Sequence, residues 1–348
     1  MVGQQGKVAN GTPDWRLFVT ERASSVLTFD ELQPRFLSHI EKTRPASLID
    51  ARSVYENHIQ SAFGALTVAE LLPEHVEAWL QAMRARKPKP YAEQTIGKHL
   101  YWLSSVIEYA REQGMVDRNV TRLVRKRHRP GRKSVNAAAV AESVLSPAAA
   151  RELIHSPLIP FERRALWSTL LLTGLRIGEA SGLRWADWDP STRPLGSLRI
   201  HQQWSTKRRE LGPTKDKTDK ILPVHQTLHA MLTEGRRWFE SHYLRQPFAD
   251  DPLLSWPKAW REIGQWNERT ALRYWKDDLA AVDLGRKVET LHLTRHTFIS
   301  LLLRAGAPEM HIRALTHVST AHDRRDAFSR YAHLDFATLC GSVELLKI

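Results

Sequence analysis

The segment from Leu166 to Asp189 contains one charge that is hard to place in a folded protein. It reads LWSTLLLTGLRIGEASGLRWADWD and is the most apolar-rich region of the chain, with Arg176 in its middle. Such a run has to be buried, and a buried arginine is costly unless a negative group lies nearby. Glu179 or Asp187 could provide that group in a structural salt bridge, or Arg176 could bind an anionic ligand. Both explanations are open at this point.

Length and composition limit the class of protein. A chain of 348 residues predicts about two domains. No stretch of roughly 18 uncharged apolar residues occurs, so we expect no membrane span. The opening residues, MVGQQGKVANGTPDW, lack an apolar signal core, and Cys340 is the only cysteine. A cytoplasmic protein is therefore expected, without intramolecular disulfides or a cysteine-rich metal site.

The charge balance points to a polyanionic partner. Lysine and arginine total 51 against 38 acidic residues, for a formal net charge of +13. A solvated basic surface would also explain this surplus, but seven of the cations fall within residues 122–133, RLVRKRHRPGRK. A cluster of this kind can lie along a phosphate backbone and release counterions on binding. The candidate DNA-binding residues are Arg122, Arg125, Lys126, Arg127, Arg129, Arg132 and Lys133.

The first third of the chain has helical patterns throughout. Thr28 and Glu31 have the spacing of a capping box, which predicts a helix over 28–45. The further helical patterns cover residues 47–60, 67–72, 74–86 and 92–113. We therefore expect an all-helical domain at 27–120, preceded by a tail at 1–26 and followed by a basic linker at 121–145.

The remainder mixes helices with a few short strands. Ser146 before Pro147 predicts a helix start, and helical patterns continue to about residue 185. Strand patterns at 195–204 and 220–225 are separated by a polar segment with turn residues, and helices resume at 226–245, 269–282 and from 294. The fold class is thus mainly α with a small antiparallel β-sheet: a helical domain, then an α+β domain at 146–333 and a tail at 334–348.

Four polar islands in this second part are poorly explained by packing or solvation. The first pairs Arg176 with Glu179, and the second, PTKDKTDKILP, contains Lys215. The third, LHLTRHTF, places His292 and Arg295 three residues apart, which is one face of a helix. The last runs from LTH at 315–317 to SRYAH at 329–333.

These islands resemble the active-site boxes of the tyrosine recombinases, the phage integrase family. TGLRIGEASGLRW resembles the first arginine box, LHLTRHTF the His-x-x-Arg-His box, LTH the Leu-Gly-His box, and RYAH carries the tyrosine. The resemblance extends over roughly residues 28–340 and includes the helical half. It implies that the helical domain at 27–120 is a core-DNA-binding domain and that the α+β domain at 146–333 is the tyrosine-recombinase catalytic domain. It implies six catalytic residues and one supporting carboxylate: Arg176, Lys215, His292, Arg295, His317, Tyr331 and Glu179.

Two positions depart from the family pattern. LTH lacks the usual glycine, and His317 precedes Tyr331 by fourteen residues, whereas His322 precedes it by nine. We favour His317 because it follows an apolar helical segment, with His322 as the alternative. Lys215 lies eight residues before Pro223, as expected for the β-hairpin lysine; Lys217 is its rival, and Lys220 corresponds better to a flanking basic position.

The same residues suit metal-free cleavage of a phosphodiester. Guanidinium groups bind non-bridging phosphate oxygens bidentately, which assigns that role to Arg176 and Arg295. A lysine beside two arginines has a lowered pKa and can protonate the leaving 5′-oxygen. The tyrosine holds the broken end as a phosphotyrosine, with His292 as base and His317 as a hydrogen-bond donor to the phosphate. No cofactor and no metal ion are expected.

The expected function is site-specific recombination, for integration or excision of a mobile element. The partners would be double-stranded DNA, three further copies in a tetramer, and accessory DNA-bending or directionality proteins, in the nucleoid of a bacterium or as a phage product. The apolar tail at 334–348 would dock on a neighbouring protomer or on its own domain. The alternatives are a type IB topoisomerase-like enzyme and an inactive DNA-binding regulator of the same fold.

Overall fold

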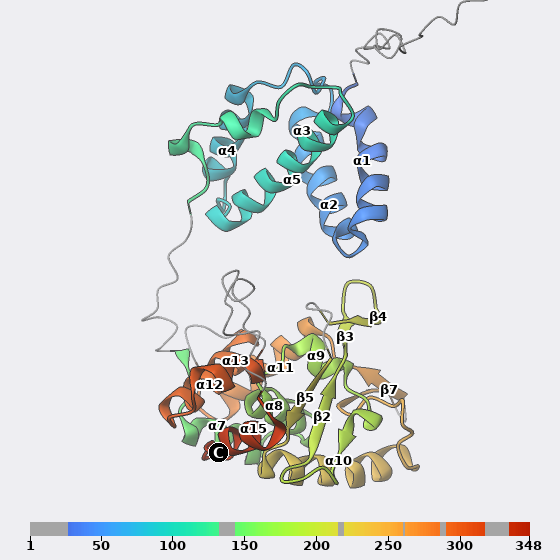
Figure 1. The fold of residues 1–348 in the computed structure, drawn as a ribbon, viewed down its shortest axis with the longest axis vertical. Helices are drawn as coiled ribbons and strands as arrows, with labels where there is room; N and C mark the ends of the chain where they lie inside the picture. Colours follow the sequence, from blue (N-terminus) through green and yellow to red (C-terminus); the bar gives the residue numbers. More distant parts are fainter. Residues whose placement is uncertain (1–26, 132–142, 215–218, 260–261, 286–289, 317–333) are drawn as a thin grey trace, which may run out of the picture. The chain divides into compact units, whose positions relative to one another are not determined.

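The computed structural model describes residues 27–131, 143–214, 219–259, 262–285, 290–316 and 334–348. The chain forms two compact units, Met1–Ser134 and Val135–Ile348. Helices dominate both, and short antiparallel sheets occur in the second, as Figure 1 shows. The expected fold class is therefore confirmed. Among the described residues, no helix is long and apolar enough to cross a membrane.

The first unit is a helical bundle around an aromatic and aliphatic core. Its α-helices are α1 (Phe29–Thr43), α2 (Leu48–Val54), α3 (Gln60–Phe63), α4 (Pro73–Ala85) and α5 (Glu93–Glu112), with shorter turns η2 (Pro45–Ser47), η3 (Tyr55–Ile59), η4 (Val120–Leu123) and η5 (Lys126–His128). The capping box of α1 is present, because the Thr28 and Glu31 side chains each accept from the other's backbone. The helix expected at 67–72 is wrong. Thr67 instead bridges to Thr28 and caps a turn with Glu70.

The basic segment begins within this unit, so the linker expected from residue 121 starts too early. Val124 is buried in the helical core. The Arg125 backbone N–H and its Nε both donate to Glu77 Oε1 at 2.9 Å, and Glu77 is itself buried. This pairing lowers the pKa of the Glu77 carboxyl to about 2. A buried apolar side chain and a buried acid thus attach residues that composition alone assigned to a linker.

A pair of stacked histidines makes the stability of the helical unit depend on pH. The rings of His58 and His99 lie 4.0 Å apart, and His99 is only 4% exposed. Burial, with the nearby charges of His58 and Lys98, lowers the pKa of His99 to about 4. Folding therefore favours the neutral ring. The contribution of His99 to the free energy of unfolding is complete above pH 6.5 and is lost as the pH falls toward 4. It amounts to a total on the order of 3 kcal/mol.

Amide hydrogen exchange along α5 tests this expectation. In the intact chain, protection of α5 is expected to fall steeply between pH 6.5 and 4, after correction for intrinsic exchange. A His99→Leu variant should lose most of that slope, because the leucine has no proton to bind. Equal slopes in the two proteins would show that other groups control the acid sensitivity of the bundle.

The second unit is built around a largely buried helix, α8 (Phe161–Thr173). Its helices are α7 (Pro147–His155), α8 (Phe161–Thr173), α9 (Ile177–Gly182), η6 (Trp185–Asp187), α10 (Gln226–Tyr243), α11 (Glu268–Ala281), α12 (His292–Arg304), α13 (Glu309–Thr316) and α15 (Phe336–Val343). Nine consecutive α8 residues, from Ala165 to Thr173, are buried, and α7, α10 and α12 pack around it. The Ser146 cap of α7 is present: its side chain accepts from the Ala149 N–H.

Among the residues that the structure describes in this unit, the strands form three small antiparallel sheets. They are β1 (Trp188–Asp189), β2 (Ser197–Ile200) and β5 (Lys220–Pro223) in the order β1-β2-β5; β3 (Gln202–Ser205) with β4 (Glu210–Pro213); and β6 (Ser255–Ala259) with β7 (Glu262–Gln265). The single strand expected at 195–204 is therefore two strands in different sheets. The polar segment expected as a connection contains β4, and the β6–β7 hairpin had no counterpart in the predictions.

The C-terminal helix packs on its own unit. Leu339, Val343 and Leu346 are buried. His225 Nε2 donates to the Leu346 carbonyl at 3.1 Å, and α15 contacts β5 and α13. In the single chain, the apolar face of the tail is thus covered by its own domain, the alternative to docking on a neighbouring protomer.

Candidate functional site

The site begins at the end of the buried helix α8. Gly174 terminates this helix with φ +66°, a left-handed conformation that glycine adopts without strain. A Cβ at this position would lie 2.5 Å from Phe298 Cδ1, so the α12 ring also requires glycine here. The chain then turns and enters α9 with Arg176 as the capping residue. This turn carries Arg176 out of the apolar run.

Arg176 has the acidic neighbour that its sequence context demands. Glu179 is 1% exposed and accepts from Arg176 twice, once from the backbone N–H and once from Nη1, both at 2.8 Å. The Arg176 side chain remains about one third exposed. Glu179 therefore orients the guanidinium and leaves part of it accessible, so the salt bridge does not prevent Arg176 from contacting a ligand.

Arg295 approaches the same turn from α12. It is 4% exposed, and its Nη1 donates to the Gly174 carbonyl at 2.7 Å. One glycine thus ends α8, admits the Phe298 ring, and holds the second guanidinium through its carbonyl oxygen. The two arginines of the first and second boxes, 119 residues apart in sequence, both lie at this turn.

His292 is the first residue of α12, one helical turn before His296. The two imidazole rings lie 4.8 Å apart and nearly perpendicular. Burial lowers the pKa of His292, and the positive charges of His296, Arg295 and Arg176 lower it further. The pKa of His296 is lowered in the same way, by burial and by Arg295. His292 is therefore neutral near pH 7 and able to accept a proton.

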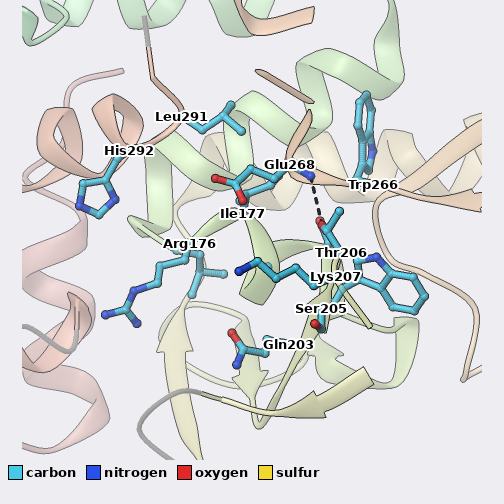
Figure 2. A pocket seen from close by; sticks show the side chains of 14 residues that line it. Arg176, Ile177, Gln203, Ser205, Thr206, Lys207, Trp266, Glu268, Leu291 and His292 are labelled. Atoms are coloured by element: carbon cyan, nitrogen blue, oxygen red, sulfur yellow. Dashed lines mark hydrogen bonds between the residues drawn. The ribbon is translucent and has the colours of Figure 1, made fainter. Parts of the chain in front are cut away.

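Arg176 and His292 line a common pocket of about 330 Å³, shown in Figure 2. The β3–β4 turn and the start of α11 complete its walls. Two buried donors that line the pocket, Ser181 Oγ on α9 and Trp266 Nε1 just before α11, have no hydrogen-bond partner among the described residues. The remaining lining residues are Leu175, Ile177, Gly178, Gln203, Trp204, Ser205, Thr206, Lys207, Glu268 and Leu291.

Several of these residues were not anticipated from the sequence. Lys207 and Glu268 extend toward the side of the pocket where Arg176 lies, from the hairpin turn and from α11 respectively (Figure 2). Glu268 also donates its backbone N–H to Thr206 Oγ1 at 3.4 Å, which joins the two walls. Lys207 lies in a polar turn between two strand-forming segments, the same signal that favoured Lys215, but β4 was not recognised and the turn was placed later.

The other predicted site residues lie outside the part of the chain that the structure describes. They are Lys215, Lys217, His317, His322, Tyr331, Arg132 and Lys133. The helix that leads to His317 is described: α13 ends at Thr316, whose hydroxyl donates to the Ile312 carbonyl, and Leu315 is buried. Lys220, the flanking basic position, donates to the Ala314 carbonyl at 2.8 Å and so ties β5 to that helix.

The predicted DNA-binding cations of the helical unit are exposed, but several also have protein partners. Arg122 pairs with Glu108 at 3.1 Å and Arg125 with Glu77. Arg129 donates to the backbone carbonyls of Val124 and Arg122. Lys126 and Arg127 lie in the exposed turn η5. The described ranges contain no group of three or more His, Cys, Asp or Glu side chains placed to hold a metal ion.

Comparison with known proteins identifies the family to which this fold belongs. The model of the phage integrase family matches residues 144–338, more than half of the chain. A tyrosine recombinase XerC from Agrobacterium fabrum is 27% identical over 240 residues, which cover 69% of this chain and 67% of the relative.

Solved structures share the fold at low sequence identity. A Tn1549 transposon integrase fragment in complex with transposon right end DNA aligns with TM-score 0.68 at 15% identity, over 92% of this chain and all of the other. A lambda integrase fragment, a dimer bound to a COC′ core site, aligns with TM-score 0.62 at 14% identity, over 84% of this chain and 96% of the other. The family match, together with the meeting of both arginine boxes at one turn, shows that this chain belongs to the phage integrase family of tyrosine recombinases.

Proposed function

We propose that this chain is a site-specific DNA recombinase that cuts and rejoins strands through a 3′-phosphotyrosyl intermediate on Tyr331. Two observations carry this proposal: Arg176 and Arg295 meet at the Gly174 turn, and a neutral His292 lines the same pocket as Arg176. These groups can bind a phosphate and accept a proton without a metal ion. Membership of the family supports the assignment of the nucleophile to Tyr331.

The arginines act on the scissile phosphate. Arg176 offers a partly exposed guanidinium whose orientation Glu179 fixes, and Arg295 adds a second fixed charge behind it. Charge develops on the non-bridging oxygens as the tyrosine attacks, and donors that are already oriented stabilise it without reorganisation. The buried Glu179 keeps Arg176 in one geometry, which is what such preorganisation requires.

The remaining roles concern protons. The phenol of Tyr331, with an ordinary pKa of about 10, loses its proton to His292 as it attacks. His317, or His322 in the alternative assignment, donates a hydrogen bond to the phosphate. The leaving 5′-oxygen is protonated by an ammonium of the hairpin region: Lys215 by its position in the sequence, with Lys217 as its rival, or Lys207 by its place in the pocket. The phosphotyrosyl bond conserves the energy of the broken diester, so religation needs no nucleotide cofactor.

The proposed partner is double-stranded DNA bearing two recombination sites, bound by four copies of the chain. A lambda integrase of the same fold has been solved as a tetramer bound to a Holliday junction, and the Tn1549 relative is a transposon integrase. By extension, we propose integration or excision of a mobile element as the biological role. The exposed cations Lys126 and Arg127 would contact the phosphate backbone, and accessory DNA-bending proteins would complete the assembly.

A nicked suicide substrate tests the reaction class. Cleavage just upstream of a nick releases a short oligonucleotide, so the covalent intermediate cannot religate and accumulates. We expect a protease-sensitive protein–DNA adduct in the presence of EDTA, and Holliday junctions when two sites are supplied. An adduct that forms only with added metal would exclude the proposed chemistry. Relaxation of supercoiled DNA without junctions would indicate the topoisomerase-like alternative, and the absence of any adduct would indicate the inactive regulator.

The lowered pKa of His292 predicts an acid-tolerant cleavage step. As the pH falls, a base with an ordinary imidazole pKa would be half protonated at 6.5, whereas burial and the charges of neighbouring groups, Arg295 and Arg176 among them, hold the pKa of His292 below that value. We therefore expect the cleavage rate in single-turnover experiments to be above half of its plateau value at pH 6.5, with the midpoint of the acidic limb below pH 6.5. A His292→Gln variant should be slow and should lack this acidic limb. A half-maximal rate at or above pH 6.5 in the wild type would contradict the assignment.

A further inference from the structure

Helix α9 and strand β3 lie closer together than two side-chain-bearing surfaces can. A Cβ built on Gly182 would lie 2.8 Å from Gln203 Cα and 3.0 Å from the Gln202 carbonyl oxygen. A Cβ on Gly178 would lie 3.1 Å from the Trp204 carbonyl oxygen. The two glycines are four residues apart and so occupy one face of the helix. β3 therefore rests directly on the backbone of α9.

A hydrogen bond fixes the seating. Gln202 Nε2 donates to the Gly182 carbonyl at 3.0 Å, so the strand cannot slide along the helix without losing this contact. β3 continues into the turn that carries Lys207, and β4 pairs with it from Ser205↔Glu210 to Gln202↔Pro213. The same short helix has Arg176 at its N-terminal end. The backbone of α9 therefore contacts the hairpin along one face and carries the proposed phosphate-binding residue, Arg176, at its N-terminal end.

We propose that Gly178 and Gly182 are positioning residues for strand cleavage: by seating β3 on α9, they hold the β3–β4 turn over the pocket at a fixed distance from Arg176. This inference rests on the proposed strand-transfer function. A methyl group at Gly182 forces the β3 backbone to retreat by about 1 Å, since carbon atoms pack at roughly 3.5–4.0 Å. A displacement of that size in a preorganised site can reduce a rate by about 100-fold.

The test compares three alanine variants in the intact chain. Gly182→Ala meets main-chain atoms of β3 at the shorter distance, Gly178→Ala meets one at the longer, and Gly341→Ala on α15 has no atom within 4 Å of its Cβ. We expect single-turnover cleavage of the suicide substrate to fall about 10- to 100-fold in Gly182→Ala and by less in Gly178→Ala. Gly341→Ala should match the wild type. DNA affinity should be unchanged in all three, because the effect is on the chemical step.

A label on the hairpin provides a readout that does not depend on activity. Cys340 is buried, so a cysteine at the exposed position Arg208 can be spin-labelled selectively. The label spectrum should change when Gly182→Ala is added and stay constant when Gly341→Ala is added. A role limited to stability would lower the melting temperature of Gly182→Ala but leave the rate of the folded protein and the label unchanged.

The outcomes are distinct. If the wild-type protein cleaves the substrate and Gly182→Ala cleaves it at the same rate, the positioning role is overturned and the proposed function stands. If the wild-type protein does not cleave the substrate, the proposed function itself is overturned. If Gly182→Ala does not fold, Gly178→Ala decides. A reduced rate at normal affinity supports the proposal, and a wild-type rate overturns it.

Discussion

Replacing Tyr331 with phenylalanine is expected to abolish the covalent protein–DNA adduct on a nicked suicide substrate. The substitution removes a single oxygen atom, the one proposed to bond to the scissile phosphorus. Without it no phosphodiester to the protein can form, so the loss should be complete rather than partial. Duplex binding should be unaffected, because the phosphate contacts are assigned to Arg176 and Arg295. The measurement is a denaturing gel with labelled DNA, run beside a binding assay.

Tyr274→Phe is a suitable control for this experiment. Tyr274 belongs to α11 of the same unit, where the guanidinium groups of Arg163 and Arg273 lie over its ring. Loss of its hydroxyl should leave adduct formation at the wild-type level. An adduct that persists in Tyr331→Phe would move the nucleophile to another residue, which peptide mapping of the adduct would identify. An adduct lost in both variants would point to damaged folding instead.

The first arginine box and the His-x-x-Arg-His box could be predicted from sequence because each is a short, local arrangement. Gly174 must end α8, and Arg176 must follow it closely to leave the core. His292 and Arg295 share one turn of α12. The interaction that joins the two boxes, Arg295 with the Gly174 carbonyl, could be expected only from the family resemblance, because no local pattern links residues 121 positions apart.

The strand pattern at 195–204 includes residues 202–204 of β3, but the separation of β3 from β2 and its pairing with β4 could not be predicted, for a physical reason. The strands β3 and β4 are rich in polar residues and show none of the alternation that marks a half-buried strand. Their position comes from tertiary contact, the main chain of β3 against Gly178 and Gly182, and such contact overrides weak local preference. In the sequence, Lys207 therefore has no feature that distinguishes it from the other lysines of this polar segment. The basic segment shows the opposite error. Its charge predicts a linker, whereas the buried Val124 and the pairing of Arg125 with Glu77 attach it to the helical bundle.

Replacing Arg176 or Arg295, the two proposed phosphate-binding arginines, with lysine is expected to slow strand cleavage by about 100- to 1,000-fold, the usual effect of removing one fixed donor to a transition-state oxyanion. Lysine retains the positive charge but offers one ammonium in place of a planar fork, so the loss measures geometry rather than charge. Arg176→Lys should fold normally, because the side chain is partly exposed. Arg295→Lys should also lower the melting temperature, because this side chain is buried against Gly174. Single-turnover rates at saturating DNA measure the first effect and calorimetry the second.

A matched surface variant and a variant of Glu179 separate the two explanations for a charge in an apolar run. Arg199→Lys, on β2 in an exposed pair with Asp219, should have a wild-type rate. If Arg176 serves only the salt bridge, lysine preserves the ion pair and cleavage should continue, while Glu179→Gln should lower stability alone. If Arg176 binds the phosphate, Arg176→Lys fails in chemistry at normal stability. Glu179→Gln then slows cleavage too, because the guanidinium loses the carboxylate that orients it. The second pattern requires that the protein orient Arg176 and still leave it accessible to DNA. The structure provides this arrangement, because Glu179 is 1% exposed and the Arg176 side chain that it binds is about one third exposed.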